Sequence, residues 1–330
     1  MKITILGSGG WGIALALSAK RNNNRVSLWS PFEKEVNSLN LTRESGKLLP
    51  GIIIPDSIKI TTDISVAEND DITIIAVPSL AVRQTAEKLS KLNNLGIVVN
   101  VSKGLESGTL KRLSQVINEE VNAPVVVLSG PSHAEEVARK VPTSLVAAGD
   151  LNAAAKVINA FSSEFLRIYT NEDLIGAELG GALKNVIALA AGFCDGLGLG
   201  DNTRAALITR GLSEIARLGV ALGAKERTFA GLTGLGDLVV TCTSRHSRNH
   251  RFGMLVGQGT DIDTALNEVG TVEGYYATKM AYELSVKTGV EMPIVNECYG
   301  VLYENRNVYE SVRKLMLRPS KDEHENLWIN

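Results

Sequence analysis

A lysine and an asparagine stand side by side in the middle of an otherwise apolar stretch, residues 178–192, with the sequence ELGGALKNVIALAAG. In a helix that turns ~100° per residue, the large apolar residues gather on one face. Lys184 and Asn185 fall on the other face, among glycine and alanine. A partly desolvated amine has a lowered pKa and exchanges protons near neutral pH, which makes Lys184 a candidate acid–base group. The helix alone leaves an alternative open, in which another helix packs on the small residues and Lys184 extends to solvent.

A second lysine, Lys103, lies just after an apolar run that reads as a strand, in the sequence NVSKG at 100–104. The next strand candidate ends in the same way, with SGPSHA at 129–134. Ligands of parallel sheets bind at the carboxyl ends of the strands. We therefore expect Lys103 at the ligand-binding edge of the sheet, although a lysine at a strand end can also be merely solvated.

Three arginines fall within seven residues in TSRHSRNHR, residues 243–251, shortly after GLGDLVVT at 234–241. Guanidinium groups bind phosphate oxygens in a bidentate manner, so this segment is a candidate anion site. The alternative is an exposed basic loop. Nucleic acid is disfavoured as a partner, since no aromatic platform and no wider basic surface accompany the arginines.

The N-terminus carries the pattern GxGxxG in residues 7–12, directly after an apolar run and at the start of an apolar helix. In this context Gly7 permits a tight turn, Gly9 lets the backbone approach a pyrophosphate, and Gly12 lets the helix pack on the strand. We therefore expect a dinucleotide cofactor. The next strand ends in Ser30-Pro31-Phe32, which offers neither the acid of an NAD site nor the arginine of an NADP site. NAD and NADP both remain open.

These residues require elements to position them, and in the first half apolar runs alternate with helical patterns. Nearly uniform apolar strands that alternate with helices predict a doubly wound parallel sheet of Rossmann type, covered on both faces. The strand candidates are 3–6, 25–29, 72–77, 97–101 and 125–128, with weaker ones at 144–148 and 166–169, and the helical patterns are 11–21, 80–92, 110–120 and 153–161; residues 48–55 read as a connection.

Strand signals stop after about residue 171, and long helical patterns follow. We expect an α/β chain with a dinucleotide-binding domain over 1–171 and an all-helical substrate and catalytic domain over 172–330. Residues 318–330 are polar, and we expect a loosely held tail there. The helical patterns of the second half are 173–192, 203–222, 261–267, 274–288 and 293–303.

Composition sets limits on location and partners. The 34 Lys and Arg nearly balance the 36 Asp and Glu, so no global charge attracts nucleic acid or a membrane. The three cysteines are widely spaced and odd in number, which favours a reducing, cytoplasmic compartment. The N-terminus reads as a strand rather than a signal peptide, and no stretch approaches the roughly 20 apolar residues of a membrane span. The histidines lack metal-ligand spacing, so we expect no metal.

Six motifs together resemble the NAD(P)-dependent glycerol-3-phosphate dehydrogenase family, and its bacterial members most. They stand in family order and at family spacing from residue 3 to about residue 303. The motifs are GSGGWGIALA, NVSKGLE, LSGPSHAEEV, GAELGGALKNVIALAAG, GLTGLGDLVVTCTSRHSRN and VEGYYATK.

The resemblance implies roles for individual residues. Lys184 matches the catalytic lysine, which exchanges a proton with the C2 oxygen of the substrate, and Lys103 matches a lysine close to cofactor and substrate. The other catalytic-centre matches are Asp237, Asn185 and Thr241. The substrate-binding matches are Lys103, Gly130, Ser132, Lys184, Asp237, Ser247, Arg248 and Asn249. The cofactor-binding candidates are Gly7, Gly9, Gly10, Trp11, Gly12, Phe32, Lys103, Ala134, Arg248 and Glu273, and two of these positions, Gly10 and Phe32, depart from the residues that the family often has.

The implied reaction is reversible hydride transfer between NAD or NADP and the substrate, which interconverts glycerol 3-phosphate and dihydroxyacetone phosphate. In the reductive direction it supplies glycerol phosphate for phospholipid synthesis. We expect a homodimer. Gly10 stands where the family often has serine or alanine, and Pro31-Phe32 stands where it often has basic residues, which argues against tight NADP selectivity. Two alternatives remain: another lysine-dependent dehydrogenase, of the 3-hydroxyacid or 6-phosphogluconate type, and a cofactor-sensing binding protein without turnover.

Overall fold

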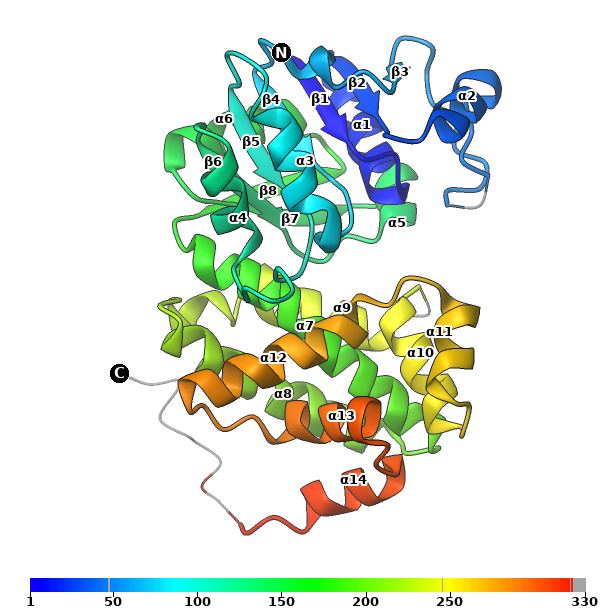
Figure 1. Ribbon diagram of the computed structural model, residues 1–330, viewed down its shortest axis with the longest axis vertical. Coiled ribbons are helices and arrows are strands. Elements are labelled where there is room, and N and C mark those ends of the chain that lie inside the picture. Colours follow the sequence, from blue (N-terminus) through cyan, green and yellow to red (C-terminus); the bar gives the residue numbers. More distant parts are fainter. Residues whose placement is uncertain (47, 245, 321, 323–330) are drawn as a thin grey trace. The chain divides into compact units, whose positions relative to one another are not determined.

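The computed structural model describes residues 1–46, 48–244, 246–320 and 322 (Figure 1). The chain divides into two compact units. The first contains Met1–Glu106 and Lys111–Leu174, and the second contains Ser107–Leu110 and the chain from Ile175 on. Most of the tail expected at 318–330 lies outside the described residues.

The first unit is built on one eight-stranded sheet in the order β3-β2-β1-β4-β5-β6-β7-β8. All neighbouring strands pair in parallel except β6 and β7, which are antiparallel. The Rossmann-type fold class is thus confirmed, with one reversed pair. The strands are β1 (Lys2–Leu6), β2 (Arg25–Trp29), β3 (Lys59–Thr61), β4 (Ile72–Ile75), β5 (Ile97–Asn100), β6 (Val125–Ser129), β7 (Thr143–Ala148) and β8 (Leu166–Asn171).

The reversed pair has a local cause in the connection between β6 and β7. A parallel neighbour requires a crossover that returns along the whole length of the strand, usually through a long helix. Here the connection holds only the five-residue helix α5 (Ala134–Ala138), and Ser129 pairs with Val146 near the point where β6 ends. The helix α6 (Leu151–Phe161), capped by Asp150, then makes a full crossover and restores parallel pairing of β8 with β7.

Helices cover both faces of this sheet (Figure 1). Alternate strand residues enter two buried clusters: Ile3 and Ile5 of β1 belong to one, and Leu6 belongs to the other. The first cluster includes residues of α1 (Gly10–Arg21), α2 (Glu33–Thr42), α5 and α6. The second includes residues of α3 (Val82–Leu89) and α4 (Leu113–Glu120). Burial on both faces explains the nearly continuous apolar strands.

In the second unit, the described residues form helices without a strand. The long helix α7 is buried over nearly its whole length, from Gly176 to Cys194. The helices are α7 (Leu174–Gly196), α8 (Asp201–Ala221), α9 (Asp237–Thr243), α10 (Arg248–Gly257), α11 (Ile262–Val269), α12 (Glu273–Thr288), α13 (Pro293–Glu304) and α14 (Val308–Met316), with a π-helical turn at Leu232–Gly236.

Helix α7 corrects the expectation that no stretch is long and apolar enough to span a membrane. By length and mean hydropathy α7 satisfies that test, but 89% of its most apolar window is buried within the structure. Its continuous hydrophobicity is therefore that of a core helix surrounded by other helices of its unit.

Candidate active site

The glycine-rich turn between β1 and α1 has the shape that a dinucleotide requires. Gly7 has a φ of +124°, and a Cβ there would lie 2.4 Å from the Ala76 carbonyl oxygen. A Cβ on Gly12 would lie 1.9 Å from the Gly7 carbonyl oxygen, so helix α1 can approach the strand only with glycine at this position. A Cβ on Gly9, in contrast, would meet no described atom within 4 Å.

The start of α1 leaves N–H groups available to a ligand. Gly9 is the N-cap, and no side chain of the described residues caps this terminus. Open space at Gly9 together with uncapped N–H groups and the positive end of the helix dipole fits a pyrophosphate. The residues present therefore fit an NAD or NADP cofactor.

Two further predicted cofactor positions lie together beside this turn. A Cβ on Gly10 would lie 3.6 Å from the Cβ of Ala134, which is ordinary van der Waals contact. The serine or alanine that the family resemblance leads us to expect at this position would thus fit here. Trp11 is half-buried and packs against the core cluster of α1. Phe32, the N-cap residue of α2, is 67% exposed.

Lys103 lies beyond the carboxyl end of β5, as expected, and it is not merely solvated. Its Nζ donates to the Gly130 carbonyl oxygen at 3.1 Å, just beyond the end of β6. The Ser132 hydroxyl donates to the same oxygen at 3.0 Å. The structure therefore brings together the predicted site residues Lys103, Gly130 and Ser132 in the first unit.

Lys184 is buried at the centre of α7, with 6% of its surface exposed. Its Nζ donates to Asp237 Oδ1 and, at 2.6 Å, to the Thr241 hydroxyl. Thr241 in turn donates to the Asp237 backbone carbonyl at 2.6 Å, and both residues lie one turn apart on α9. A buried ammonium is tolerated only when it is paired and hydrogen-bonded. The interpretation in which Lys184 extends to solvent is therefore wrong.

The other part of that interpretation, in which a helix packs on the small residues of α7, agrees with the structure. A Cβ on Gly192 would lie 2.2 Å from the His250 carbonyl oxygen, and one on Gly196 would lie 2.3 Å from that of Met254. Nearer the start of α7, a Cβ on Gly180 would lie 2.4 Å from the Thr233 carbonyl oxygen. Glycine thus allows the backbones of α10 and the π-helical turn to pack directly on α7.

Asn185 and Asn249 link three helices of the second unit. Asn249 Nδ2 donates to Asn185 Oδ1 at 2.9 Å, and Asn249 Oδ1 accepts from the Gly274 N–H at 2.8 Å. Asn185 Nδ2 donates to Glu273 Oε2 at 3.4 Å. This network joins the residue next to Lys184 to the starts of α10 and α12, and it contains three predicted site residues.

The remaining residues of the arginine segment differ in exposure. Ser247 is buried, and its hydroxyl caps α10 by accepting from the His250 N–H at 3.2 Å. Arg248, the first residue of α10, is exposed and makes no ion pair with any residue that the structure describes. Arg245 lies outside the described residues. Within this candidate anion segment, residues 248–251 thus form the start of a helix, and the alternative of an exposed basic loop does not describe them.

Sequence reasoning missed an ion-paired cluster that fixes α10 against α7. His250 Nε2 lies 2.7 Å from Asp195 Oδ2, and Arg204 of α8 donates to Asp195 Oδ1 at 2.7 Å. His250 and Asp195 are 55 residues apart and belong to no shared motif. Nothing in the sequence pattern pointed to this pair.

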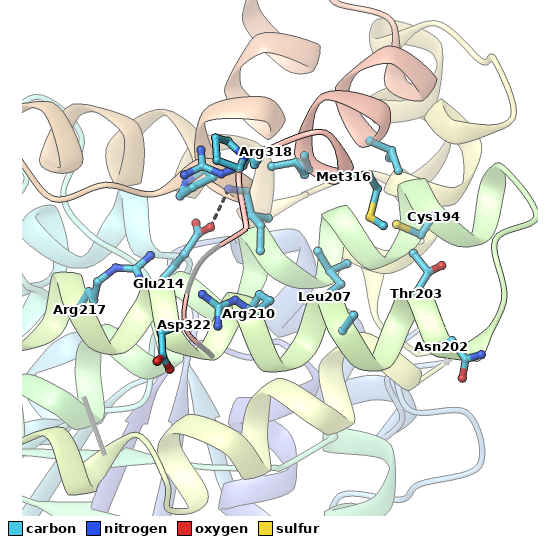
Figure 2. A pocket seen from close by; sticks show the side chains of 16 residues that line it. Cys194, Asn202, Thr203, Leu207, Arg210, Glu214, Arg217, Met316, Arg318 and Asp322 are labelled. Atoms are coloured by element: carbon cyan, nitrogen blue, oxygen red, sulfur yellow. Dashed lines mark hydrogen bonds between the residues drawn. The ribbon is translucent and has the colours of Figure 1, made fainter. Parts of the chain in front are cut away.

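A cavity of about 600 Å³ lies in the second unit between α8, α13 and α14, and none of its lining residues is a predicted site residue. Figure 2 shows Arg210, Glu214 and Arg217 projecting from α8, with Arg318 opposite them. Glu214 accepts from the Ile294 N–H at 2.8 Å at the start of α13. Burial raises the pKa of Glu214 to about 7. Glu214 in this cavity thus caps a helix, and the predicted site residues lie elsewhere in the chain.

A glycine fingerprint on a Rossmann-type sheet and a buried, carboxylate-paired lysine in a helical unit define a class of protein, the NAD(P)-dependent dehydrogenases. Two family descriptions match the chain: NAD-dependent glycerol-3-phosphate dehydrogenase N-terminus over residues 2–155 and the corresponding C-terminus over residues 173–313. The chain belongs to this glycerol-3-phosphate dehydrogenase family, and it is an oxidoreductase that uses NAD or NADP.

Similar proteins agree with this assignment. The chain is 51% identical over 327 residues to a glycerol-3-phosphate dehydrogenase [NAD(P)+] of Thermoanaerobacter sp., a match that covers 98% of this chain and 99% of the relative. It is 49% identical over 328 residues to one of Fusobacterium nucleatum, with 97% and 98% covered. The crystal structure of the Coxiella burnetii glycerol-3-phosphate dehydrogenase has a TM-score of 0.92 at 37% identity and covers 96% of this chain and 99% of its own.

More distant structures show the fold alone. A ketopantoate reductase of Ralstonia eutropha matches with a TM-score of 0.63 at 14% identity, over 96% of this chain and 100% of its own. The assignment to the glycerol-3-phosphate dehydrogenases therefore rests on the close relatives, which support it over the other two interpretations.

Proposed function

We propose that the chain interconverts glycerol 3-phosphate and dihydroxyacetone phosphate, with Lys184 as the acid–base group. The bound cofactor supplies or accepts the hydride at its nicotinamide. The observation that carries the proposal is the buried amine of Lys184, held by Asp237 and Thr241 at the centre of α7.

Lys184 would donate a proton to the C2 oxygen when the ketone is reduced and would accept it in the reverse direction. Asp237 and Thr241 hold Nζ in one place, so the amine does not have to be reoriented during the reaction. Because Asp237 contacts the amine directly, the proton affinity of Lys184 belongs to the pair rather than to the lysine alone.

Arg248 is the residue that we propose to bind the phosphate. It is exposed at the start of α10, where the helix dipole also favours an anion. The side chains of Ser247 and Asn249 already bond within the protein, which supports a role for them in fixing the start of α10. Asn249 still has one amide hydrogen that these bonds do not use.

The other predicted site residues are proposed to bind either the cofactor or the substrate. We propose that the glycine turn, Trp11, Phe32 and Ala134 hold the adenosine and pyrophosphate parts, and that Glu273 contacts the cofactor from α12. Lys103 and Ser132 share the Gly130 carbonyl oxygen, so they form one polar group beyond the strand ends. We propose that this group contacts the substrate.

The compartment, pathway and assembly are also proposals. Three free, buried cysteines support a reducing, cytoplasmic compartment, and membership of the family supports a role in supplying glycerol phosphate for phospholipids. We further propose a homodimer, and sedimentation at twice the chain mass would support it.

A substrate panel tests the proposed reaction. NADH and NADPH oxidation would be followed with dihydroxyacetone phosphate and with a 3-keto acid, and NAD and NADP reduction with 6-phosphogluconate. We expect turnover with dihydroxyacetone phosphate alone. Turnover of another substrate would assign the chain to that dehydrogenase type, and cofactor binding without any turnover would favour a cofactor-sensing protein.

A further inference from the structure

A carboxylate lies near the carboxyl end of β2, although no acidic residue follows this strand directly in the sequence. In a dinucleotide-binding unit, the acid that contacts the adenosine ribose usually follows this strand directly, but here Ser30 follows Trp29. Trp29 pairs with Leu6 across the sheet, and the Gly7 N–H donates to the Trp29 carbonyl oxygen at 2.9 Å. Ser30 therefore stands level with the first glycine of the fingerprint.

Glu35 reaches this position from the first turn of α2. The Ser30 hydroxyl donates to Glu35 Oε2 at 2.5 Å and accepts from the Phe32 N–H at 3.3 Å. Ser30 itself is 1% exposed and its N–H donates to the Thr61 carbonyl oxygen, so the hydroxyl is fixed to the sheet. A buried serine thus holds a half-buried carboxylate where an NAD site has its acid.

The second oxygen of this carboxylate is available. Glu35 Oε1 accepts no hydrogen bond from the residues that the structure describes, and none of their cations pairs with Glu35. Arg43, at the C-terminal end of α2, is a basic residue that would attract the 2′-phosphate of NADP. Its guanidinium, however, already pairs with Asp56 at 3.3 Å and donates to the Ile58 carbonyl oxygen at 3.0 Å.

We propose that Glu35, positioned by Ser30, selects NAD over NADP in this chain. The inference rests on the proposed cofactor site and adds its specificity. The free carboxylate oxygen can accept a hydrogen bond from a ribose 2′-hydroxyl. A 2′-phosphate has a charge of about −1.5 to −2 at neutral pH and no comparable donor, so the carboxylate repels it.

Binding of cofactor fragments tests this specificity without turnover. ADP-ribose and 2′-phospho-ADP-ribose would be titrated calorimetrically into the wild type, Glu35→Gln and Glu33→Gln. Glu33 is the matched control, since it lies in the same first turn of α2 and is exposed. We expect the wild type to bind ADP-ribose at least about tenfold more tightly, which corresponds to about 1.4 kcal/mol.

The variants separate the local carboxylate from general surface charge. Glu35→Gln should lower the ratio of the two affinities by at least about fivefold, and Glu33→Gln should leave it within about twofold. Ser30→Ala should give an intermediate ratio because the carboxylate remains but is no longer held. Thermal unfolding of each variant would show that the fold is intact.

Several outcomes would overturn the inference: equal or tighter wild-type binding of the 2′-phosphate fragment, an unchanged ratio in Glu35→Gln, or an equal change in Glu33→Gln. If dihydroxyacetone phosphate is still reduced in these cases, the proposed function stands and only the specificity assignment fails. If neither fragment binds, the cofactor site itself is contradicted together with the inference.

Discussion

Within the arginine segment, neighbouring residues have different tasks. Ser247 caps α10, and Asn249 joins Asn185 to Gly274, so both side chains already bond within the protein. Arg248, between them, is exposed. The family resemblance assigned all three residues to the substrate, and of the three only Arg248 presents an exposed side chain.

Replacing Arg248 by alanine should therefore weaken phosphate binding specifically. We expect the KM for dihydroxyacetone phosphate to rise by about 10- to 100-fold, since hydrogen bonds to charged groups contribute about 1.5–3 kcal/mol. The activity with dihydroxyacetone, which lacks the phosphate, should stay nearly constant. Arg251→Ala is the control, because Arg251 is exposed one turn further along α10. An unchanged KM in Arg248→Ala would remove this residue from the phosphate site.

Among the elements, α7 and α10 depend on each other through glycine. Gly192 and Gly253 face each other so closely that a Cβ on Gly192 would lie 2.9 Å from the Gly253 Cα. The cluster of His250, Asp195 and Arg204 ties the same two helices. Since α7 contains Lys184 and α10 contains Arg248, this packing positions the proposed acid–base group relative to the proposed anion-binding residue.

Gly192→Ala should disturb this packing. The added methyl group would meet backbone atoms of α10, which cannot move away as a flexible side chain can. We expect a loss of at least about 2 kcal/mol in the free energy of unfolding, as for an overpacked core. Gly46→Ala is the control, because a Cβ there would meet no described atom within 4 Å. Urea denaturation measures both, and equal stability of the two variants would contradict the packing argument.

The elements also show which parts of the fold the sequence could predict. Strands β4 and β6 and the long helix α7 were predictable, because burial on all sides makes their sequences almost continuously apolar. Strand β3, at the sheet edge, has only three residues, and α5 has five, so neither spans enough residues for a periodic signal. Helices α2, α9, α10 and α14 were not predicted either.

The site likewise has parts that could be predicted from the sequence and parts that could not. The glycine turn was predictable because its three glycines form a recognisable pattern within six residues, directly after a strand and at the start of a helix. The partner of Lys184 was not predictable from periodicity, because Asp237 is 53 residues away, and only the family resemblance suggested it. The pairing of Ser30 with Glu35 depends on how α2 turns back toward β2, and no residue pattern indicates it.

On the scale of the molecule, Glu214 places an ionisable group in the core of the helical unit. It caps α13 through the Ile294 and Val295 N–H groups, and it is 3% exposed. Burial is the main cause of its raised pKa, while the two N–H donors lower the pKa in part. Stability of the protein should therefore depend on the charge of this one carboxyl group.

The sign of this dependence follows from proton uptake. With a folded pKa of about 7 against an ordinary 4.5, the folded protein retains the Glu214 proton where the unfolded chain has lost it. The contribution of Glu214 to stability is thus complete below about pH 4.5 and is lost as the pH rises through 7. Relative to Glu214→Gln, the wild type should lose on the order of 3 kcal/mol of unfolding free energy across this window. A constant difference between the two proteins would contradict the raised pKa.

The central claim is that the buried amine of Lys184 performs the proton transfer, and one comparison tests it most directly. Reduction of dihydroxyacetone phosphate would be measured in the wild type, in Lys184→Ala and in Lys287→Ala, an exposed control on α12. NADH binding would be measured on the same preparations. We expect Lys184→Ala to lose about a thousandfold in kcat while its Kd for NADH stays within about threefold, and Lys287→Ala to behave as the wild type. Near-normal turnover in Lys184→Ala would contradict the account.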